Sequence, residues 1–490
     1  MKTALVVIIF SCVERFIGFL YRIFLARSLD AELIGIYQVT LSVIGVLVTL
    51  SASGIPITVS RLMIKERESG NIRGENDVVS AGILSSLILS LPITLILYFF
   101  KNQFSFIFAD PRCYDLFLII LPGVVITSVY AVIRGYFWGN QNFFTYSLIE
   151  LLEEVVMCLS GVIIITISKN AWQKTLGAAQ SVLISYIFSF ILSTATFILK
   201  SGKITNPLLK LKPLMKSSSP ITLMRTLTSF LGSVVAIILP NKLVASGLSQ
   251  NLSMKLFGEL SGMAMPLLFI PSTVIGSIAL VIVPKLSQSY YRKDSKNLNF
   301  AILKSVDYSL IISCLIVPIF IACGNEIGQI IYKNQNAGHY LSVSAFIMVP
   351  MSLTLISNSI LNSLNREKFT LINFILGAVC MIFSVMFLTK FVGVYSLIIG
   401  YLISYVLTSL LNFIMLSKIT HHGKIYLKKT AIYTLIVAVT TLLGFFMHGI
   451  LFGRVSNFVM VLILGVLLLA FSCVFIFVCG IFDFKKIFTN

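Results

Sequence analysis

Apolar stretches about as long as one bilayer crossing recur fourteen times along this chain of 490 residues. A helix crosses the hydrocarbon core in about 20 residues, and lipid offers its backbone no hydrogen-bond partners. Hydrophobic residues make up 57% of the chain and charged residues 11%, against about 25% charged residues in a soluble domain. The sequence therefore predicts an all-α polytopic membrane protein with about 14 transmembrane helices. The predicted spans are 3–27, 34–59, 78–100, 116–138, 145–168, 175–199, 218–240, 254–283, 299–323, 340–362, 369–389, 393–416, 430–449 and 456–480.

Basic residues favour every second connection between these spans. The net charge is +19, but its distribution argues against nucleic acid as a partner. If the N-terminus lies in the cytoplasm, 22 Lys and Arg face inward and 9 face outward. The positive-inside rule then predicts that both termini are cytoplasmic. We expect the basic connections to attract anionic membrane lipid.

Short sequence matches recur between the two halves of the chain. Leu33-Ile34-Gly35 precedes Leu256-Phe257-Gly258 by 223 residues, and Arg15 and Arg225 take similar places in their spans. Parallel repeats are a transporter architecture, with the substrate path between the lobes. The repeat predicts two six-helix lobes and two helices outside them. The predicted parts are an N-terminal lobe over 1–200, a basic cytoplasmic linker over 201–217, a C-terminal lobe over 218–416, and additional helices over 417–490.

Charged residues inside the spans are the strongest indication of function. A central Arg or Lys costs about 2.5–3.5 kcal/mol to insert, so most such groups must form ion pairs, reach the interface or line a water-filled cavity. The first span holds Arg15 near its middle and Arg22 two turns away, with no acid in the helix able to neutralise both. We predict a substrate-binding role for four cavity cations: Arg15, Arg22, Arg225 and Lys255.

Other charges in the spans have partners nearby in the sequence. Lys304 and Asp307 are three residues apart and predict a local ion pair, while Arg134 and Glu150 predict a pair near the interface. Lys255 and Glu259 are one helical turn apart, so they either neutralise each other or line the cavity. Four acids are candidates for ion coupling or charge balance: Glu14, Glu153, Glu154 and Glu259.

Glycine and proline interrupt several spans. Such breaks are tolerated where neighbouring groups or a cavity satisfy the freed backbone. They can serve as hinges for rocking lobes, or they can be ordinary kinks that improve packing. The candidate hinges are Gly54, Pro56, Pro122, Pro266 and Pro271.

The sequence lacks the motifs of a nucleotide-driven or metal-dependent enzyme. No GxxxxGK[ST] loop occurs, the histidines show no metal-binding spacing, and the cysteines form no CxxC pair. We therefore expect no catalytic residues, no metal and no cofactor, and we do not expect an enzyme.

Three segments match the patterns of one protein family. Residues 134–142, RGYFWGNQN, followed by the acids and valines of 153–156, resemble the pattern RGYFQG-x-QN…EQVVR. Residues 257–265, FGELSGMAM, resemble YGELTGFAM, and residues 54–62, GIPITVSRL, resemble GLPVAISKL. Together they are similar to the stage V sporulation protein B family, in the polysaccharide-transporter branch of the multidrug/oligosaccharidyl-lipid/polysaccharide (MOP) flippases. Trp138, Glu154 and Met157 depart from the usual Gln, Gln and Arg of that family.

The resemblance implies a flippase of the bacterial cytoplasmic membrane, with two lobes around a V-shaped central cavity and two additional helices. Its substrate would be a polyprenyl-diphosphate-linked sugar, either an oligosaccharide or a peptidoglycan precursor, for spore cortex or cell-wall synthesis. Cell-wall synthesis enzymes would be further partners. Two alternatives stay open. One is an ion-coupled multidrug exporter of the same superfamily, with an acid-centred site at Glu153 or Glu259; the other is a non-transporting membrane scaffold for cell-wall enzymes.

Overall fold

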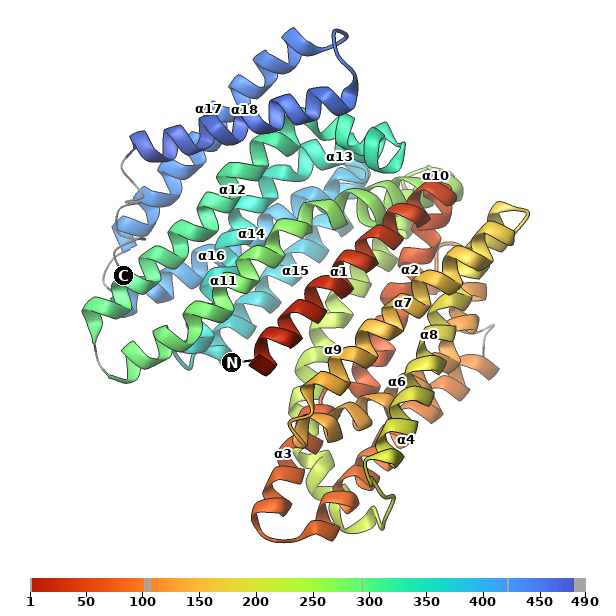
Figure 1. The fold of residues 1–490 in the computed structure, drawn as a ribbon. Coiled ribbons are helices and arrows are strands. Elements are labelled where there is room, and N and C mark those ends of the chain that lie inside the picture. The colour runs from red at the N-terminus through yellow and green to blue at the C-terminus, as the bar shows by residue number, and fades with distance from the viewer. Residues whose placement is uncertain (1, 101–102, 104–106, 293, 421–422, 480–490) are drawn as a thin grey trace. The chain divides into compact units, whose positions relative to one another are not determined.

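The computed structural model describes residues 2–100, 103, 107–292, 294–420 and 423–479, which form long helices joined by short connections (Figure 1). The chain divides into two compact units, Met1–Gly258 and Glu259–Asn490. The helices of the first unit are α1 (Lys2–Ser28), α2 (Ala31–Ala52), α3 (Ile55–Glu68), α4 (Ile72–Phe99), α6 (Arg112–Gly139), α7 (Phe143–Ile167), α8 (Ala171–Leu199), α9 (Leu208–Ala245) and α10 (Gln250–Phe257).

The second unit begins within a seven-residue π-helix, whose first residue, Gly258, is the last residue of the first unit. The elements from that point are η2 (Gly258–Ala264), α11 (Met265–Tyr291), α12 (Ser295–Tyr332), α13 (Gln335–Ser344), η3 (Ala345–Ile347), α14 (Met348–Ser363), α15 (Glu367–Val392), α16 (Tyr395–Thr420), α17 (Gly423–Leu451) and α18 (Asn457–Val478).

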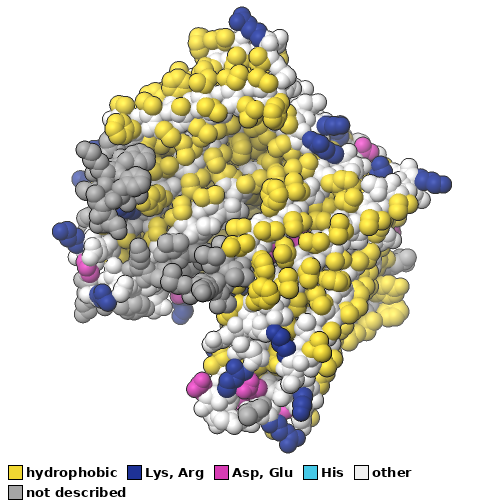
Figure 2. Space-filling model, viewed as in Figure 1, with side chains coloured by type: hydrophobic (Ala, Val, Ile, Leu, Met, Phe, Trp, Pro, Cys, Tyr) yellow, Lys and Arg dark blue, Asp and Glu magenta, His cyan; other side chains and the backbone are white. Residues whose placement is uncertain are grey.

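The described helices account for the predicted membrane crossings. Twelve helical runs are long and apolar enough to cross a bilayer in the part of the chain that is described. Helices α1 and α7, with 27 and 25 residues, are also long enough, but each carries three charged residues in its middle. Counting these two gives the predicted fourteen. In the first unit, hydrophobic side chains cover the sides of the helices and Lys and Arg gather at the end near α3 (Figure 2).

Helix α6 is the central helix of the first unit and packs against α2, α3, α4 and α8. Its crossing with α3 depends on two glycines one turn apart. A Cβ atom at Gly135 would lie 2.6 Å from the carbonyl oxygen of Pro56, and one at Gly139 would lie 3.3 Å from the sulfur of Met63. Small residues at this spacing let membrane helices approach closely. The glycines of the segment 134–142 therefore have a packing role.

The variant Gly135→Ala tests this crossing. The added methyl group would collide with the α3 backbone, and overpacking of a packed interior costs about 1–3 kcal/mol. Gly45→Ala is the matched control, because no atom lies near a Cβ at that position of α2 and alanine is favoured in helices by about 0.5–1 kcal/mol. We expect a lower midpoint of thermal unfolding in detergent for Gly135→Ala alone. Equal midpoints for the two variants would contradict the close contact.

One helix ending occurs in both units, 224 residues apart. After α6, Gln141 adopts the left-handed conformation with a φ of 53°, and after α14, Asn365 does so with a φ of 60°. In each case the next N–H donates to the carbonyl five residues earlier, at 2.8 Å in the first unit and 3.0 Å in the second. The same ending also follows α3 at Gly70, α8 at Ser201 and α9 at Gly247, so it is a common helix ending in this chain and the internal repeat stays a prediction.

The predicted linker 201–217 is only partly a connection. Helix α9 begins at Leu208 and continues to Ala245, and it packs against α2, α3 and α4 of the first unit. The division of the chain into lobes around a cavity stays a prediction.

Helix α12 is the central helix of the second unit, and a buried ion pair joins it to α17. Asp307 is 5% exposed and accepts hydrogen bonds from Nζ of Lys429 at 2.7 and 2.6 Å. The predicted pair of Asp307 with Lys304 is wrong. The carboxylate faces α17, which supplies its own lysine, whereas Nζ of Lys304 lies 4.6 Å from the ring centroid of Phe300.

Breaking this pair should destabilise the second unit. The side chains of Asp307 and Lys429 are 7% and 19% exposed, and removal of one partner from a buried pair costs about 3–5 kcal/mol. We expect Asp307→Asn or Lys429→Met to lower the midpoint of thermal unfolding in detergent. The double variant Asp307→Leu with Lys429→Met should recover most of the loss, because a buried pair can often be replaced by apolar groups. A double variant no more stable than either single one would refute the pairing.

Candidate functional site

The charged residues of the first unit gather where α1 packs along α7. Two glycines bring the helices together. A Cβ atom at Gly18 would lie 2.5 Å from Oε1 of Glu154, and Gly161 leaves room for the ring of Tyr21. The hydroxyl of Tyr21 forms a hydrogen bond of 3.0 Å with Ser181 of α8. Close approach of the helices thus places Glu154 beside the charged face of α1.

Arg15 and Arg22 are exposed on α1, and Glu14 is half-buried. Arg22 is near enough to Glu154 for their charges to attract each other, as is Arg15 to Glu14. Neither arginine forms an ion pair with any described residue. The carboxylates balance charge in this region without enclosing the two guanidinium groups.

Arg134 of α6 and Glu150 of α7 form the predicted ion pair, with Nη1 and Oε1 3.3 Å apart. The ring centroids of Trp138 and Tyr146 lie 5.4 and 6.0 Å from the guanidinium carbon. Aromatic faces attract a cation at such distances. Arg134 is therefore held by its own unit, and Trp138, a departure from the family pattern, contributes to holding it.

The neighbouring acids Glu153 and Glu154 face different helices, as consecutive positions on a helix must. Glu153 lies beside Ser189 of α8 and near Tyr130 of α6, whereas Glu154 faces α1. Of the two, only Glu154 shares the region of the α1 arginines.

Arg225 is positioned by the break between α2 and α3. Helix α9 crosses directly over Gly54, where a Cβ atom would lie 2.7 Å from the carbonyl oxygen of Ser218. Farther along α9, Arg225 is exposed and donates from Nη1 to the carbonyl oxygen of Ser53 at 3.3 Å. Carbonyls at the end of a helix lack partners within that helix. The break in the span therefore supplies the acceptor that orients this arginine.

Lys255 and Glu259 have different surroundings. Lys255, in α10, is exposed, whereas Glu259, in the π-helix η2, is 1% exposed. Oε1 of Glu259 accepts hydrogen bonds from Nδ2 of Asn334 at 3.2 Å and Nδ2 of Asn336 at 3.3 Å. The carboxylate is thus engaged by the segment that begins α13.

The candidate hinge residues occupy several kinds of position. Gly54 and Pro56 lie at the break between α2 and α3. Pro122 lies inside the continuous helix α6, Pro266 in the first turn of α11, and Pro271 further along that helix. Their role as hinges stays a prediction.

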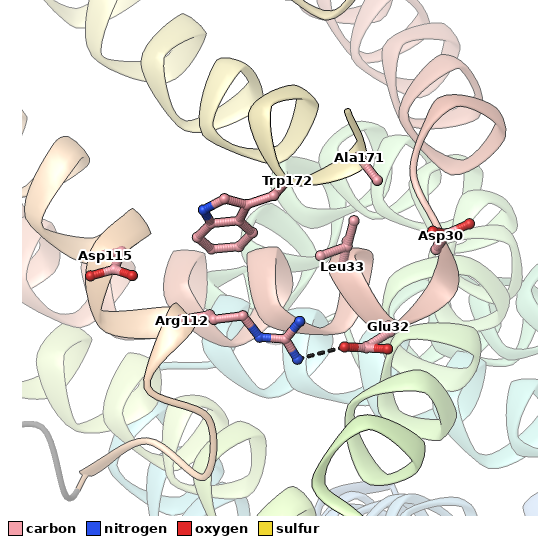
Figure 3. Close-up of a pocket in the computed structure, with 7 residues that line it drawn as sticks. All are labelled: Asp30, Glu32, Leu33, Arg112, Asp115, Ala171 and Trp172. Atoms are coloured by element: carbon pink, nitrogen blue, oxygen red, sulfur yellow. Dashed lines mark hydrogen bonds and ion pairs between the residues drawn. The ribbon is translucent and has the colours of Figure 1, made fainter. Parts of the chain in front are cut away.

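A cavity of about 350 Å³ opens in the first unit where α2, α6 and α8 begin (Figure 3). Arg112, within it, forms ion pairs with Glu32 at 2.5 Å and with Asp110 at 2.7 Å. Its guanidinium is engaged by carboxylates, and acids outnumber bases in the lining, so the cavity does not suit a phosphate group. The lining residues are Asp30, Glu32, Leu33, Arg112, Asp115, Ala171 and Trp172.

Sequence reasoning missed the residues that hold several charges in place. Lys429 is 122 residues from Asp307, and Asn334 and Asn336 are 75 and 77 residues from Glu259. No local spacing reports such contacts. In the described part of the chain, no group of three or more His, Cys, Asp or Glu is arranged to hold a metal ion.

Known proteins share both sequence and architecture with this chain. Residues 1–290 match the family described as "Polysaccharide biosynthesis protein". Stage V sporulation protein B of Bacillus subtilis (strain 168) is 25% identical over 390 residues, covering 77% of this chain and 75% of that protein. Lipid II flippase MurJ of the same organism is 18% identical over 476 residues, covering 87% and 84%.

Two solved structures show the same fold. A structure of Lipid II flippase MurJ in an inward closed conformation has a TM-score of 0.75 at 14% identity, covering 96% of this chain and 99% of that one. An inward-facing multidrug resistance MATE family transporter of the MOP superfamily has a TM-score of 0.69 at 15% identity, covering 84% and 95%. The fold is that of the MOP transporters, with multiple membrane-crossing helices. Because the family match spans more than half of the sequence, the chain belongs to the polysaccharide biosynthesis protein family.

Proposed function

We propose that this protein flips a lipid-linked oligosaccharide or peptidoglycan precursor across the bacterial cytoplasmic membrane by alternating access, for spore cortex or cell-wall synthesis. The names of two relatives, a stage V sporulation protein and a Lipid II flippase, support this class of substrate. The proposal rests on three exposed arginines without ion-pair partners on membrane-crossing helices of the first unit. Arg15, Arg22 and Arg225 are exposed and form no ion pair with any described residue.

The cost of placing arginine in lipid favours a water-filled path beside these three residues. Three arginines facing lipid would cost about 8–10 kcal/mol by insertion scales, as much as the whole stability of many domains, about 5–15 kcal/mol. A path that holds water and an anionic substrate removes this cost. The guanidinium group presents forked donors that match phosphate oxygens, so a diphosphate is the part of the substrate that the arginines would bind, with Lys255 as a fourth cation.

The mechanism needs no nucleotide. The polyprenyl tail stays in the bilayer while the charged headgroup passes through the path between inward-open and outward-open states. With cytoplasmic termini, transport moves about two negative charges outward. An inside-negative potential favours this by about 2.3 kcal/mol per charge per 100 mV. Anionic lipid would bind the basic inward connections, and cell-wall synthesis enzymes would use the product.

Loss of the arginines should slow translocation. We expect Arg15→Ala and Arg225→Ala each to reduce the flipping of a fluorescent polyprenyl-diphosphate sugar in proteoliposomes by about ten-fold or more, because a hydrogen bond to a charged group contributes about 1.5–3 kcal/mol. Lys169→Ala, at an exposed position between α7 and α8, is the control and should flip the lipid at the wild-type rate. Wild-type rates in both arginine variants would rule out the phosphate-binding role.

Ion-coupled drug export is the second candidate, favoured by the fold of the MATE transporter and by the half-buried acids Glu14, Glu153 and Glu154. An exporter would move a cationic dye against its gradient when a sodium or proton gradient is imposed, and it would do so without Arg15. The flippase proposal predicts no dye transport in the same proteoliposomes.

A further inference from the structure

Two tyrosines of α16 point away from the lipid-exposed side of that helix. Tyr401 and Tyr405 are one helical turn apart, and Thr408 and Asn412, on the same side of the helix, are only 3% and 0% exposed. Both tyrosines are nevertheless partly exposed. They therefore border an internal space and not the surrounding lipid. The opposite side of α16 carries exposed apolar residues: Ile403, Val406 and Leu410.

The hydroxyl groups of Tyr401 and Tyr405 form no hydrogen bond with any described residue. The two residues follow the start of α16 by about 9 and 15 Å, within a hydrocarbon core about 30 Å thick. Membrane tyrosines usually gather at the two interfaces instead. Because a hydroxyl without a partner is costly in an apolar place, the space beside α16 must hold water or a ligand that forms hydrogen bonds.

The two rings form one aromatic surface with Phe269 of α11. The centroids of Tyr401 and Tyr405 lie 5.9 Å apart with 12° between the ring planes, and Phe269 meets Tyr401 at 6.0 Å and 77°. Phe269 is also partly exposed. Thr354 of α14 donates to the carbonyl oxygen of Tyr405 at 3.0 Å, which helps to fix the position of that ring. Three helices of the second unit thus hold the surface in place.

The surroundings of this surface are neutral. Among the described residues, no Asp, Glu, Lys, Arg or His lies near enough to Tyr401 or Tyr405 for its charge to act on the hydroxyl group. A phosphate group would find no cation here, and a charged drug would find no carboxylate. The ligand that fits is therefore uncharged, with an apolar face for the rings and polar groups for the hydroxyls.

We infer that Phe269, Tyr401 and Tyr405 form a binding site for a neutral sugar. One face of a pyranose ring carries C–H groups, which the electronegative face of an aromatic ring attracts. Its edge carries hydroxyl groups, which can both donate to and accept from a tyrosine hydroxyl. Aromatic walls with a few polar groups are typical of small-ligand sites. Use of the site for the sugar of the transported lipid rests on the proposed function; the binding of a sugar does not.

Sugar binding can be measured on the purified protein without any polyprenyl lipid. The protein is placed in phospholipid nanodiscs, free of glycoside detergent, and saturation-transfer NMR is recorded with diacetylchitobiose as the probe. We expect saturable transfer to the ring C–H protons of the probe for the wild type. Tyr401→Leu and Tyr405→Leu remove a stacking face, so each should raise the half-saturating probe concentration about ten-fold. Tyr401→Phe keeps the ring and loses one hydrogen bond, so the rise should be about three- to ten-fold.

Phe383→Leu is the matched control. Phe383 and Phe387 of α15 also form a stacked pair in the second unit, with centroids 5.8 Å apart, but Phe383 is 54% exposed and has no hydroxyl group. Its replacement should leave the sugar response unchanged. A wild type that shows no transfer, or leucine variants that respond as the wild type does, would overturn the inference. Retention of tetraphenylphosphonium but not of diacetylchitobiose would overturn it in favour of a cation site. If the leucine variants do not fold, the response of Tyr401→Phe decides.

Because the probe carries neither a phosphate nor a polyprenyl chain, failure of this assay is distinct from failure of the flippase proposal. A protein that binds diacetylchitobiose but does not flip the lipid would refute the flippase alone. A protein that flips the lipid but does not bind the probe would refute this site alone.

Discussion

Inserting an unpaired charge into a bilayer costs several kcal/mol of free energy. The charged residues within the helices of this protein fall into two groups. Some charges find partners within one unit, as Arg134 does with Glu150 across α6 and α7. Others stay open: Arg15, Arg22 and Arg225 are exposed and form no ion pair with any described residue. The paired charges hold helices together, and the three unpaired arginines are the groups for which we propose a ligand.

Close backbone approach decides where the charges of the first unit lie. Gly18 leaves room for the carboxylate of Glu154, so α7 can bring an acid to the charged face of α1. Gly54, at the break between α2 and α3, lets α9 cross directly over it, and Arg225 then reaches the carbonyl of Ser53. Gly18 and Gly54 therefore leave the room that the charged residues of the candidate site need. The packing of the first unit and its proposed chemistry depend on the same two glycines.

Much of this architecture can be predicted from the sequence, because a bilayer imposes length and polarity on each helix. The number of spans and the Arg134–Glu150 pair, formed between consecutive helices, follow from such local patterns. Contacts between distant helices do not. The sequence spacing predicted Lys304 as the partner of Asp307, but Asp307 forms its ion pair with Lys429. Likewise, no residue near Glu259 in the sequence indicates its contacts with Asn334 and Asn336. Sequence patterns also do not show whether Arg15, Arg22 and Arg225 line one path, because each pattern describes a single helix.

Native mass spectrometry can decide whether the open arginines recognise a diphosphate. The purified protein would be incubated with equal amounts of a polyprenyl-diphosphate sugar and phosphatidylglycerol, which share an apolar tail and a negative charge. We predict preferential retention of the diphosphate lipid, and its displacement by inorganic pyrophosphate. Equal retention of both lipids, with no effect of pyrophosphate, would contradict a phosphate-binding role for Arg15, Arg22 and Arg225.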